Sequence, residues 1–356
     1  MRVGRDRQPG GTETLTFAYD SLDRLTDATG YAGALTAHYE YNAIGNLTRK
    51  QEGQLDLELT YPASAPTSVR PHAVSSVKHK GNGATYRTFA YDAAGNLDYV
   101  NSAAESDYAF DAEHRVQQRT YGAARVSYVY DGAGAMVQRT TEHYTEPAAN
   151  ETTVYIGGLY EENLTTDVAT KYYSALGRTI AMRKGGEVSY LLADHLGATT
   201  AVLDDAGNVT ASHKYWPFGA ERELSGDGRA TDRWYTGQKE EDFDGLGLYN
   251  YRARMYSTLT GRFTSADKIT QDPLNPQNHN RYSYVVNQPL KFTDPTGHCF
   301  SWDYGGAEPI TFDCGENKEN LLTWLDWALN RADWVGDIAR QGISQRTFGQ
   351  LSSEAG

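Results

Sequence analysis

The feature that most constrains the fold is a short pattern that recurs through the first part of the chain. Each copy has two aromatic residues separated by one residue, then an aspartate or asparagine, two turn residues, a Gly-Asn or equivalent pair, and an aliphatic residue. Where copies follow one another directly, their second aromatic residues lie 19 to 22 residues apart. Five copies are clear: Phe17–Leu25, Tyr39–Leu47, Phe89–Leu97, Tyr108–Val116 and Tyr128–Met136.

Each copy predicts a β-hairpin. Two aromatic residues spaced by one lie on the same face of a strand. The following aspartate can hydrogen-bond the turn backbone, and Gly-Asn tolerates the left-handed conformation. One hairpin is only marginally stable in water, but stacked hairpins bury a continuous face. The sequence therefore predicts an all-β fold, a curled ribbon of stacked hairpins. The recurring Tyr-Asp pairs belong to this scaffold and not to acid–base chemistry.

Charge and composition exclude several classes of protein. The formal net charge is −13, which argues against a nucleic-acid surface and against docking on anionic membranes. No stretch approaches 18 consecutive apolar residues, so no membrane span is expected. The first ten residues are charged and no apolar segment follows them, so they are not a signal peptide. Metal-binding and phosphate-binding motifs are missing from the sequence, and no metal or cofactor is predicted.

The chain beyond residue 190 resembles the RHS repeat-associated core of the RHS/YD-repeat family. The resemblance rests on five blocks that occur in the order typical of the family. Together with the upstream hairpins it covers about residues 15–297. The blocks are Asp194–Gly197, Tyr215–Gly219, Gly247–Tyr256, Gly261–Asp267 and Asn280–Gly297.

This resemblance implies a function as well as a fold. YD repeats in the family wind into a hollow β shell, and the variable chain that follows the core is often a toxin held inside. We therefore expect a shell or carrier segment of an exported bacterial toxin, secreted or at the cell surface. Its partners would be its own C-terminal tail as cargo and secretion-system or cell-surface proteins. The alternative is a non-enzymatic adhesion or glycan-contacting repeat protein.

The resemblance also suggests how the chain is divided. Residues 1–14 are disordered or the start of a fragment, because so few hairpins cannot enclose a cargo and a longer chain is expected upstream. Residues 15–189 are YD hairpins, residues 190–297 the core, and residues 298–356 a variable tail. The helical spacing of Leu and Trp residues between Glu319 and Ile343 predicts a small α-helical tail. The tail is an effector, the start of a truncated effector, or a plug inside the shell. As a function for the chain, an enzymatic tail is a weaker alternative than the carrier and the adhesion protein.

Some members of the family release the tail by self-proteolysis, which uses two aspartates and an arginine. The matching residues are Asp267, Asp294 and Arg262, and cleavage would fall after Gly297, in the region of His298 and Cys299. One carboxyl group must activate water while the other donates a proton, so their pKa values must differ. At most, the sequence supports an autoproteolytic activity.

Several alternatives stay open at this stage. Asp272 lies in an insertion, residues 271–276, and is a rival partner for Asp267. Asp267 and Asp294 are also common residue types for turns and strand ends. His195 is interpreted as a turn residue, since no nucleophile elbow accompanies it. Cys299 and Cys314 are either free thiols or a disulfide, which would stabilise by roughly 3 kcal/mol for a loop of about 15 residues.

Overall fold

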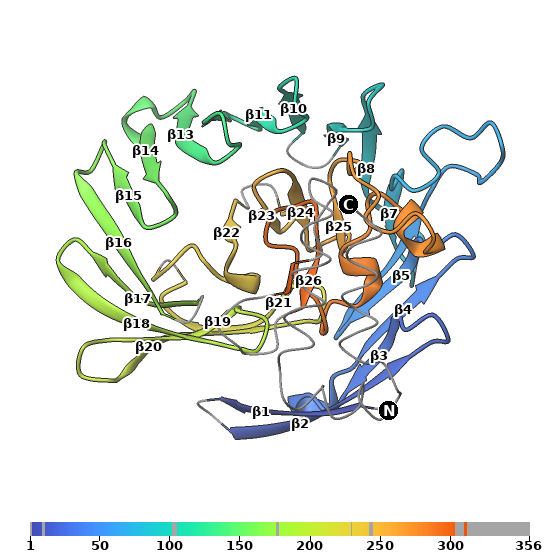
Figure 1. Ribbon diagram of the computed structural model, residues 1–356, viewed down its shortest axis with the longest axis horizontal. Helices are drawn as coiled ribbons and strands as arrows, with labels where there is room; N and C mark the ends of the chain where they lie inside the picture. The colour runs from blue at the N-terminus through green and yellow to red at the C-terminus, as the bar shows by residue number, and fades with distance from the viewer. Residues whose placement is uncertain are drawn as a thin grey trace, which may run out of the picture. The chain divides into compact units, whose positions relative to one another are not determined.

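The computed structural model describes residues 2–8, 11–101, 105–175, 178–228, 230–241, 245–302 and 310–311. These residues form β-strands and short 3-10 helices, which confirms the predicted all-β fold (Figure 1). The predicted tail helices between Glu319 and Ile343 lie outside the described residues. Within the described residues, no helix is long and apolar enough to cross a membrane. Contacts divide the chain into residues 1–311 and 312–356, and only the first unit is described below.

Twenty-one strands form one antiparallel sheet, here called the ribbon. Each strand pairs with the next one in the sequence, from β1 with β2 to β20 with β21. The strands are β1 (Arg2–Gln8), β2 (Gly11–Tyr19), β3 (Leu25–Thr29), β4 (Ala37–Tyr41), β5 (Leu47–Glu52), β6 (Leu55–Thr60), β7 (Ser76–His79), β8 (Thr85–Tyr91), β9 (Leu97–Asn101), β10 (Ser106–Phe110), β11 (Val116–Tyr121), β12 (Ala124–Tyr130), β13 (Met136–His143), β14 (Glu151–Ile156), β15 (Tyr160–Asn163), β16 (Val168–Ala175), β17 (Arg178–Lys184), β18 (Glu187–Ala193), β19 (Thr199–Leu203), β20 (Val209–Tyr215) and β21 (Glu221–Gly226).

The repeated motif makes the hairpin turns in the way its residues predict. In the first copy, the side chain of Asp20 accepts hydrogen bonds from the backbone N–H groups of Leu22 and Arg24. Asp111 accepts the same two bonds from residues two and four positions later. The residue three positions after this aspartate, or after Asn42 in the second copy, has a positive φ, for example 79° at Gly45. Asp23 and His114 adopt the same positive φ although they are not glycine. The hydrogen-bonded turn therefore outweighs the preference of these residues for negative φ.

A second bond joins successive hairpins and was not predicted. The second tyrosine of a motif donates its hydroxyl to the carbonyl oxygen of the aliphatic residue in the preceding hairpin. Tyr41 Oη lies 2.8 Å from the oxygen of Leu25, and Tyr130 Oη lies 2.7 Å from that of Val116. The motif thus buries its ring and pairs its hydroxyl, which a buried polar group requires.

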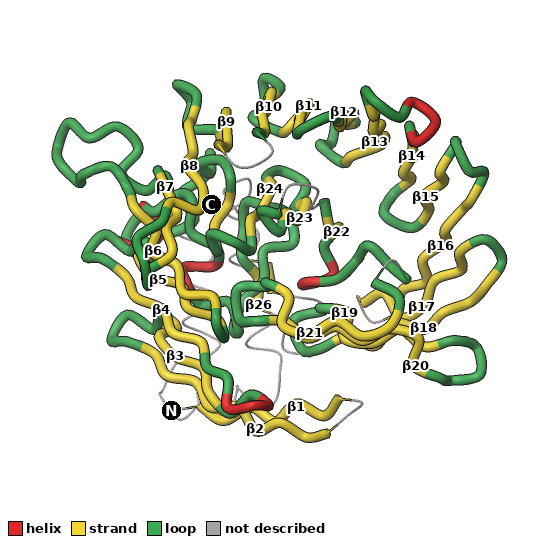
Figure 2. The backbone as a smooth tube through the Cα atoms, turned by 180° about the vertical axis from the view of Figure 1, so that it is seen from behind, coloured by secondary structure: helices red, strands yellow, loops and turns green. Residues whose placement is uncertain are grey.

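After Gly226 the chain leaves the ribbon and runs inside its curve, as residues 230–241 and 245–297 (Figure 2). This inner segment has few regular elements: strands β22 (Lys239–Glu240), β23 (Leu248–Asn250), β24 (Met255–Ser257) and β25 (Arg262–Phe263), with helices η3 (Tyr235–Gly237), η4 (Pro276–His279) and η5 (Val285–Asn287). Strands β26 (Ser301–Trp302) and β27 (Ile310–Thr311) follow it, and helices η1 (Ala32–Ala34) and η2 (Pro147–Ala149) lie between ribbon strands.

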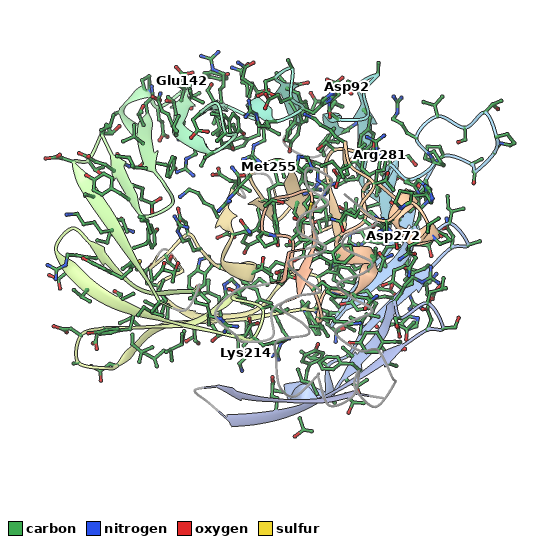
Figure 3. All side chains as sticks on the ribbon, viewed as in Figure 1. Asp92, Glu142, Lys214, Met255, Asp272 and Arg281 are labelled. Atoms are coloured by element: carbon green, nitrogen blue, oxygen red, sulfur yellow. The ribbon has the colours of Figure 1, made fainter. Side chains whose placement is uncertain are left out.

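The inner segment packs against the ribbon on several sides. Met255 lies inside the curve, whereas Glu142 lies on the ribbon itself (Figure 3). Met255 belongs to a buried cluster with ribbon residues such as Leu57 and Val126, and a second cluster joins Tyr284 to Met182. Apolar side chains of the ribbon's concave face therefore have their partners on the inner segment.

The two ends of the ribbon meet through side chains. Arg222 on β21 donates two hydrogen bonds to the carboxylate of Glu13 on β2, at 3.0 and 2.7 Å. The Arg222 guanidinium also lies 4.7 Å from the centre of the Tyr31 ring. The hydrogen bond from Arg222 lowers the pKa of the Glu13 carboxyl group. A side-chain ion pair thus connects β2 to β21, in addition to the consecutive strand pairing.

Candidate functional site

Two buried carboxylates meet at one guanidinium in the inner segment. Arg254, just before β24, places its Nη2 atom 2.8 Å from Asp267 Oδ2 and 3.4 Å from Asp294 Oδ2. Asp267 follows β25 and Asp294 follows η5. All three residues are less than 9% exposed. Burial lowers the pKa of the Arg254 guanidinium, while the two carboxylates act in the opposite direction. Such a group of charges is stable only because its members neutralise one another.

The surroundings of Asp294 favour its protonated form. Burial raises the pKa of this carboxyl group and the neighbouring Asp267 raises it further, against the effect of Arg254 and of backbone N–H donors. Its Oδ1 atom accepts hydrogen bonds from the backbone nitrogens of Gly297 at 2.8 Å and Cys299 at 3.1 Å. Asp294 Oδ1 also accepts from the nitrogen of Thr296 at 3.3 Å, and the nitrogen of His298 donates to Thr296 Oγ1 at 3.3 Å. Asp294 therefore lies under the turn formed by residues 294–299.

Asp267 contacts three nitrogen groups. Its Oδ1 atom accepts from the backbone nitrogen of Ile269 at 3.0 Å and lies 2.9 Å from His298 Nδ1. Its Oδ2 atom faces Arg254. The two aspartates thus differ in their surroundings: Asp267 faces Arg254 and the His298 ring, whereas burial raises the pKa of Asp294. Pairs of carboxyl groups with this asymmetry supply an acid and a base.

The peptide bond after Gly297 lies directly beside these groups. Arg254 donates its Nε–H to the carbonyl oxygen of Gly297. Gly297 has a φ of 77°, and a Cβ at this position would lie 2.5 Å from the carbonyl oxygen of Tyr251. Only glycine can bring the chain this close to Arg254 without strain. The same arginine therefore contacts both carboxylates and the carbonyl group of one specific peptide bond.

A small cavity adjoins this peptide bond. Its volume is about 30 Å³, and roughly 10–15 Å³ is enough for one water molecule when polar partners surround it. Its lining includes both aspartates, Arg254, His298 and Gln271. The arrangement combines two carboxyl groups, an arginine on a carbonyl oxygen and room for water.

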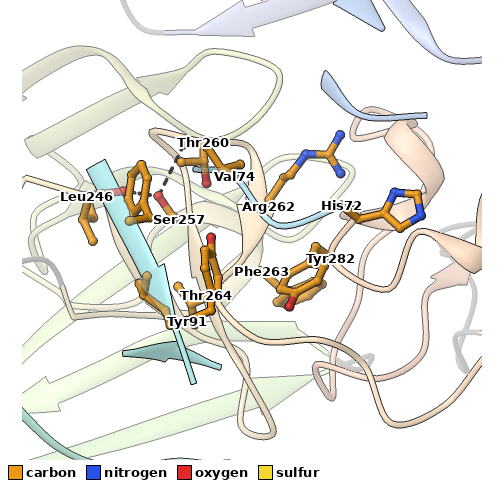
Figure 4. Close-up of a pocket in the computed structure, with 12 residues that line it drawn as sticks. His72, Val74, Tyr91, Leu246, Ser257, Thr260, Arg262, Phe263, Thr264 and Tyr282 are labelled. Atoms are coloured by element: carbon orange, nitrogen blue, oxygen red, sulfur yellow. Dashed lines mark hydrogen bonds between the residues drawn. The ribbon is translucent and has the colours of Figure 1, made fainter. Parts of the chain in front are cut away.

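The predicted arginine lies elsewhere. Arg262 donates to Tyr61 Oη at 3.0 Å and to the carbonyl oxygen of Gly45 at 3.1 Å. Figure 4 shows its side chain beside His72, at a separate cavity. Burial, together with the charge of Arg262, lowers the pKa of His72 to about 4. Arg262 therefore joins the inner segment to the ribbon, and Arg254 is the arginine between the aspartates.

The remaining candidates occupy distinct positions. Asp272 accepts a hydrogen bond from the nitrogen of Leu274 within its own turn. His195 lies in a ribbon turn, with Nε2 3.2 Å from the carbonyl oxygen of Leu290. Cys299 is disulfide-bonded, and Cys314, the only other cysteine of the sequence, lies outside the described residues.

Sequence reasoning missed Arg254, although it lies in one of the quoted blocks, Gly247–Tyr256. The available signal was an arginine among tyrosines in a segment otherwise suited to burial. A buried arginine requires carboxylate partners, and the two proposed aspartates were the obvious ones.

Comparison with known proteins identifies one family over most of the chain. The model of the Teneurin YD-shell family matches residues 10–290. A tRNA3(Ser)-specific nuclease, WapA of Bacillus spizizenii, is 25% identical over 79% of this chain and 12% of its own length. Toxin subunit YenC2 of Yersinia entomophaga is 25% identical over 80% of this chain and 29% of its own. The double-stranded DNA deaminase toxin A of Burkholderia cenocepacia is 25% identical over 81% and 21%, respectively.

Solved structures give a weaker likeness. A crystal structure of TcdB2-TccC3 without its hypervariable C-terminal region is 18% identical, with a TM-score of 0.47. The match covers 80% of this chain and 18% of the solved one. The chain thus spans less than a third of the length of each of the curated relatives named above.

Proposed function

Because this chain belongs to the Teneurin YD-shell family, we propose that it is a shell segment of an exported bacterial toxin. We further propose that it hydrolyses one peptide bond of its own, between Gly297 and His298. The observation that carries the second proposal is the position of Arg254, which contacts Asp267, Asp294 and the carbonyl oxygen of Gly297.

The relatives support a carrier role. Their names give three different descriptions, a tRNA nuclease, a toxin subunit and a DNA deaminase toxin, yet each aligns with about four fifths of this chain. A region shared by proteins with different activities is expected to be the common shell and not the active part. In this proposal the protein is secreted or exposed at the cell surface, its own tail is the cargo, and secretion-system or cell-surface proteins are its other partners.

The proposed reaction assigns one step to each group. Asp267 accepts a proton from a water molecule in the adjoining cavity, and the water oxygen attacks the carbonyl carbon of Gly297. Arg254 stabilises the negative charge that develops on the carbonyl oxygen. Asp294 donates its proton to the nitrogen of His298 as the carbon–nitrogen bond breaks. These steps give a carboxylic acid on Gly297 and an amine on His298, and transfer of the carboxyl proton to the amine yields a carboxylate and an ammonium group.

Intact mass tests the cleavage directly. The purified chain is measured beside Asp267→Asn, Asp294→Asn and Arg254→Met, with Asp272→Asn as the matched control. We expect the wild type and the control to yield two products that separate after Gly297, and the other three variants to stay whole. An uncut wild type in folded, pure protein would refute self-cleavage.

One observation favours the alternative of a binding ribbon. Tyr173 on β16 and Tyr190 on β18 are 46% and 48% exposed, and both pair with Ala181 on the strand between them. Exposed rings on one sheet face are suited to contacts with sugars or proteins. The adhesion function predicts that the chain binds cells and that Tyr173→Ser with Tyr190→Ser abolishes binding, whereas the carrier function predicts no such dependence.

A further inference from the structure

We infer that the residues around the cut form a binding site for the new N-terminus of the tail, which stays attached to the shell after cleavage. This inference rests on the proposed self-cleavage. The site, here called the tail latch, consists of Asp267, Gln271 and Asp294 on the shell side. Its ligand is a peptide that begins with the free amine of His298.

The tail side of the cut is held at several atoms. The ring of His298 bonds Asp267 through Nδ1 at 2.9 Å, and the carbonyl oxygen of His298 accepts from Gln271 Nε2 at 2.6 Å. The nitrogen of Cys299 donates to Asp294 at 3.1 Å. Farther along, the rings of Phe300 and Phe292 lie 5.0 Å apart. None of these contacts uses the bond between Gly297 and His298, so all of them can persist when it breaks.

The charges created by the cut match the groups already present. Hydrolysis leaves a carboxylate on Gly297, whose oxygen is already bonded to Arg254. It leaves an ammonium group on His298, beside the acidic side chains of Asp267 and Asp294. A new anion beside a cation and a new cation beside an anion are both favoured in a buried site. The site is therefore complementary to the products as well as to the intact chain.

The side-chain oxygen of Gln271 offers a hydrogen-bond acceptor beside the scissile bond. Its Oε1 atom is buried and has no hydrogen-bond partner among the described residues, and Gln271 lines the cavity beside the scissile bond. A buried amide oxygen without a donor costs free energy. The N–H group of the uncut amide donates to Thr296 Oγ1 at 3.3 Å, whereas the new ammonium group carries additional N–H donors. Gln271 thus bonds the carbonyl group of His298 and offers an acceptor to its amine.

The loop that carries Gln271 is well anchored. Asn275 caps η4 by accepting from the nitrogen of Gln277 at 3.0 Å, and His279 Nε2 lies 3.1 Å from the carbonyl oxygen of Pro273. Gln277 in turn donates to the carbonyl oxygen of Leu22 in the ribbon at 2.9 Å. An anchored side chain loses less conformational entropy when it binds a ligand.

The disulfide of Cys299 does not explain retention of the tail. The only other cysteine of the sequence, Cys314, also follows Gly297, so a bond between them leaves both cysteines on the same product. The latch therefore consists of non-covalent contacts alone, and substitutions can weaken it.

Retention of the tail by the cut protein tests the inference. Each full-length variant is incubated until denaturing mass spectrometry shows complete cutting, and is then separated by native size-exclusion chromatography. We expect the wild-type tail to elute with the shell. Gln271→Ala and His298→Leu should each release it about 10-fold faster, the effect of losing one hydrogen bond to a charged or carbonyl group. His298→Asn keeps an N–H donor for Asp267 and should restore part of the retention. Asp272→Ala, in the same loop, is the matched control.

The possible outcomes separate the two proposals. An uncut wild type refutes the self-cleavage, and the latch with it. A cut wild type whose tail elutes alone refutes only the latch. The latch is also refuted if the tail stays bound equally well in the wild type, in Gln271→Ala and in His298→Leu, because other contacts then hold the tail. If Gln271→Ala is never cut, Gln271 positions the scissile bond, and the latch as stated here is wrong.

Discussion

The ribbon and the inner segment are built by opposite means. Ribbon strands pair with their neighbours in the sequence, and the motif turns use a local aspartate or asparagine as their cap. The inner segment has short strands and depends on distant partners: Asn280 donates to the carbonyl oxygen of Gly45, and Tyr282 to that of Gly95. Regular repeats supply a frame, and the irregular segment supplies the groups suited to chemistry.

Backbone conformation shows the same contrast. In the motif turns of the ribbon, positive φ values occur one residue at a time, and mostly at glycine. In η5, Val285, Val286 and Asn287 have φ values of 41°, 49° and 62° in succession. β-branched residues rarely adopt this region and do so at a cost of about 1–3 kcal/mol each. This strained turn lies shortly before Asp294, and the inner segment is therefore expected to be the more sensitive of the two regions to substitution.

The largest difference between the regions is expected for buried charge. Arg254→Met leaves two carboxylates without their partner, and we expect it to lower the free energy of unfolding by about 3–5 kcal/mol and to abolish the cut. Arg24→Met removes the ion pair to Asp20 in a ribbon turn and should cost about 1 kcal/mol or less. Denaturant unfolding monitored by fluorescence measures both, and equal losses would contradict the comparison.

Glycine substitutions give the next largest effect. Gly297→Ala places a Cβ 2.5 Å from the carbonyl oxygen of Tyr251, and the shifted peptide bond should be cut roughly 100-fold more slowly. Gly134→Ala, in a ribbon turn with a φ of 81°, should cost about 1 kcal/mol of stability and leave the cleavage rate unchanged. The rates come from a time course of intact mass. A Gly297→Ala chain cut at the wild-type rate would contradict the site geometry.

Aspartates in the two regions should respond to pH with opposite signs. Burial, with the charge of Asp267, raises the pKa of Asp294 above its ordinary value of 3.8. Its folded form therefore binds a proton more tightly than its unfolded form, so this contribution to stability is present at low pH and is lost as pH rises through the raised pKa. We expect Asp294→Asn to remove this loss of stability at higher pH. In the wild type, the cleavage rate should fall over the same pH window, because Asp294 loses the proton that it donates.

Asp20 provides the comparison for this pH experiment. Burial acts to raise its pKa, but hydrogen bonds from the Arg24 side chain and from the backbone of Arg24 and Leu22 outweigh it, and the pKa is lowered. Its stabilising contribution is present above 3.8 and is lost as pH falls through the lowered pKa. Denaturant unfolding across acidic pH, for the wild type, Asp294→Asn and Asp20→Asn, measures both. Effects of the same sign would refute the assignment.

The smallest effect is expected for a single bond between hairpins. Tyr41→Phe removes the hydroxyl that donates to Leu25 and keeps the ring, so it should lower the free energy of unfolding by about 1 kcal/mol. It should not change the cleavage rate, because the hydrogen bond joins two ribbon hairpins. A slower cut in Tyr41→Phe would show that the ribbon influences the inner segment more directly than we infer.

Local patterns in the sequence predicted hairpins for most of the ribbon, but β1 and the strands β19 to β21 lie outside the range predicted for them, and the site was predicted only in part. The motif predicted hairpin turns because a turn aspartate bonds residues two and four positions away. The family resemblance pointed to Asp267 and Asp294, which the structure brings together. It pointed to Arg262 as well, but the choice between two buried arginines depends on which distant partners each one meets. No periodicity in the sequence encodes the bond between Arg254 and Gly297, or the pair of Glu13 and Arg222.

Consecutive strand pairing also has a consequence for the order of folding. Contacts that are close in sequence form quickly, whereas loops of hundreds of residues close slowly. Each ribbon hairpin can therefore form as soon as it leaves the ribosome or a secretion channel. The inner segment needs partners such as Gly45, 235 residues before Asn280, and comes last. In the mechanism proposed above, the cut would then act as an assembly checkpoint: a chain is divided only after its frame is complete.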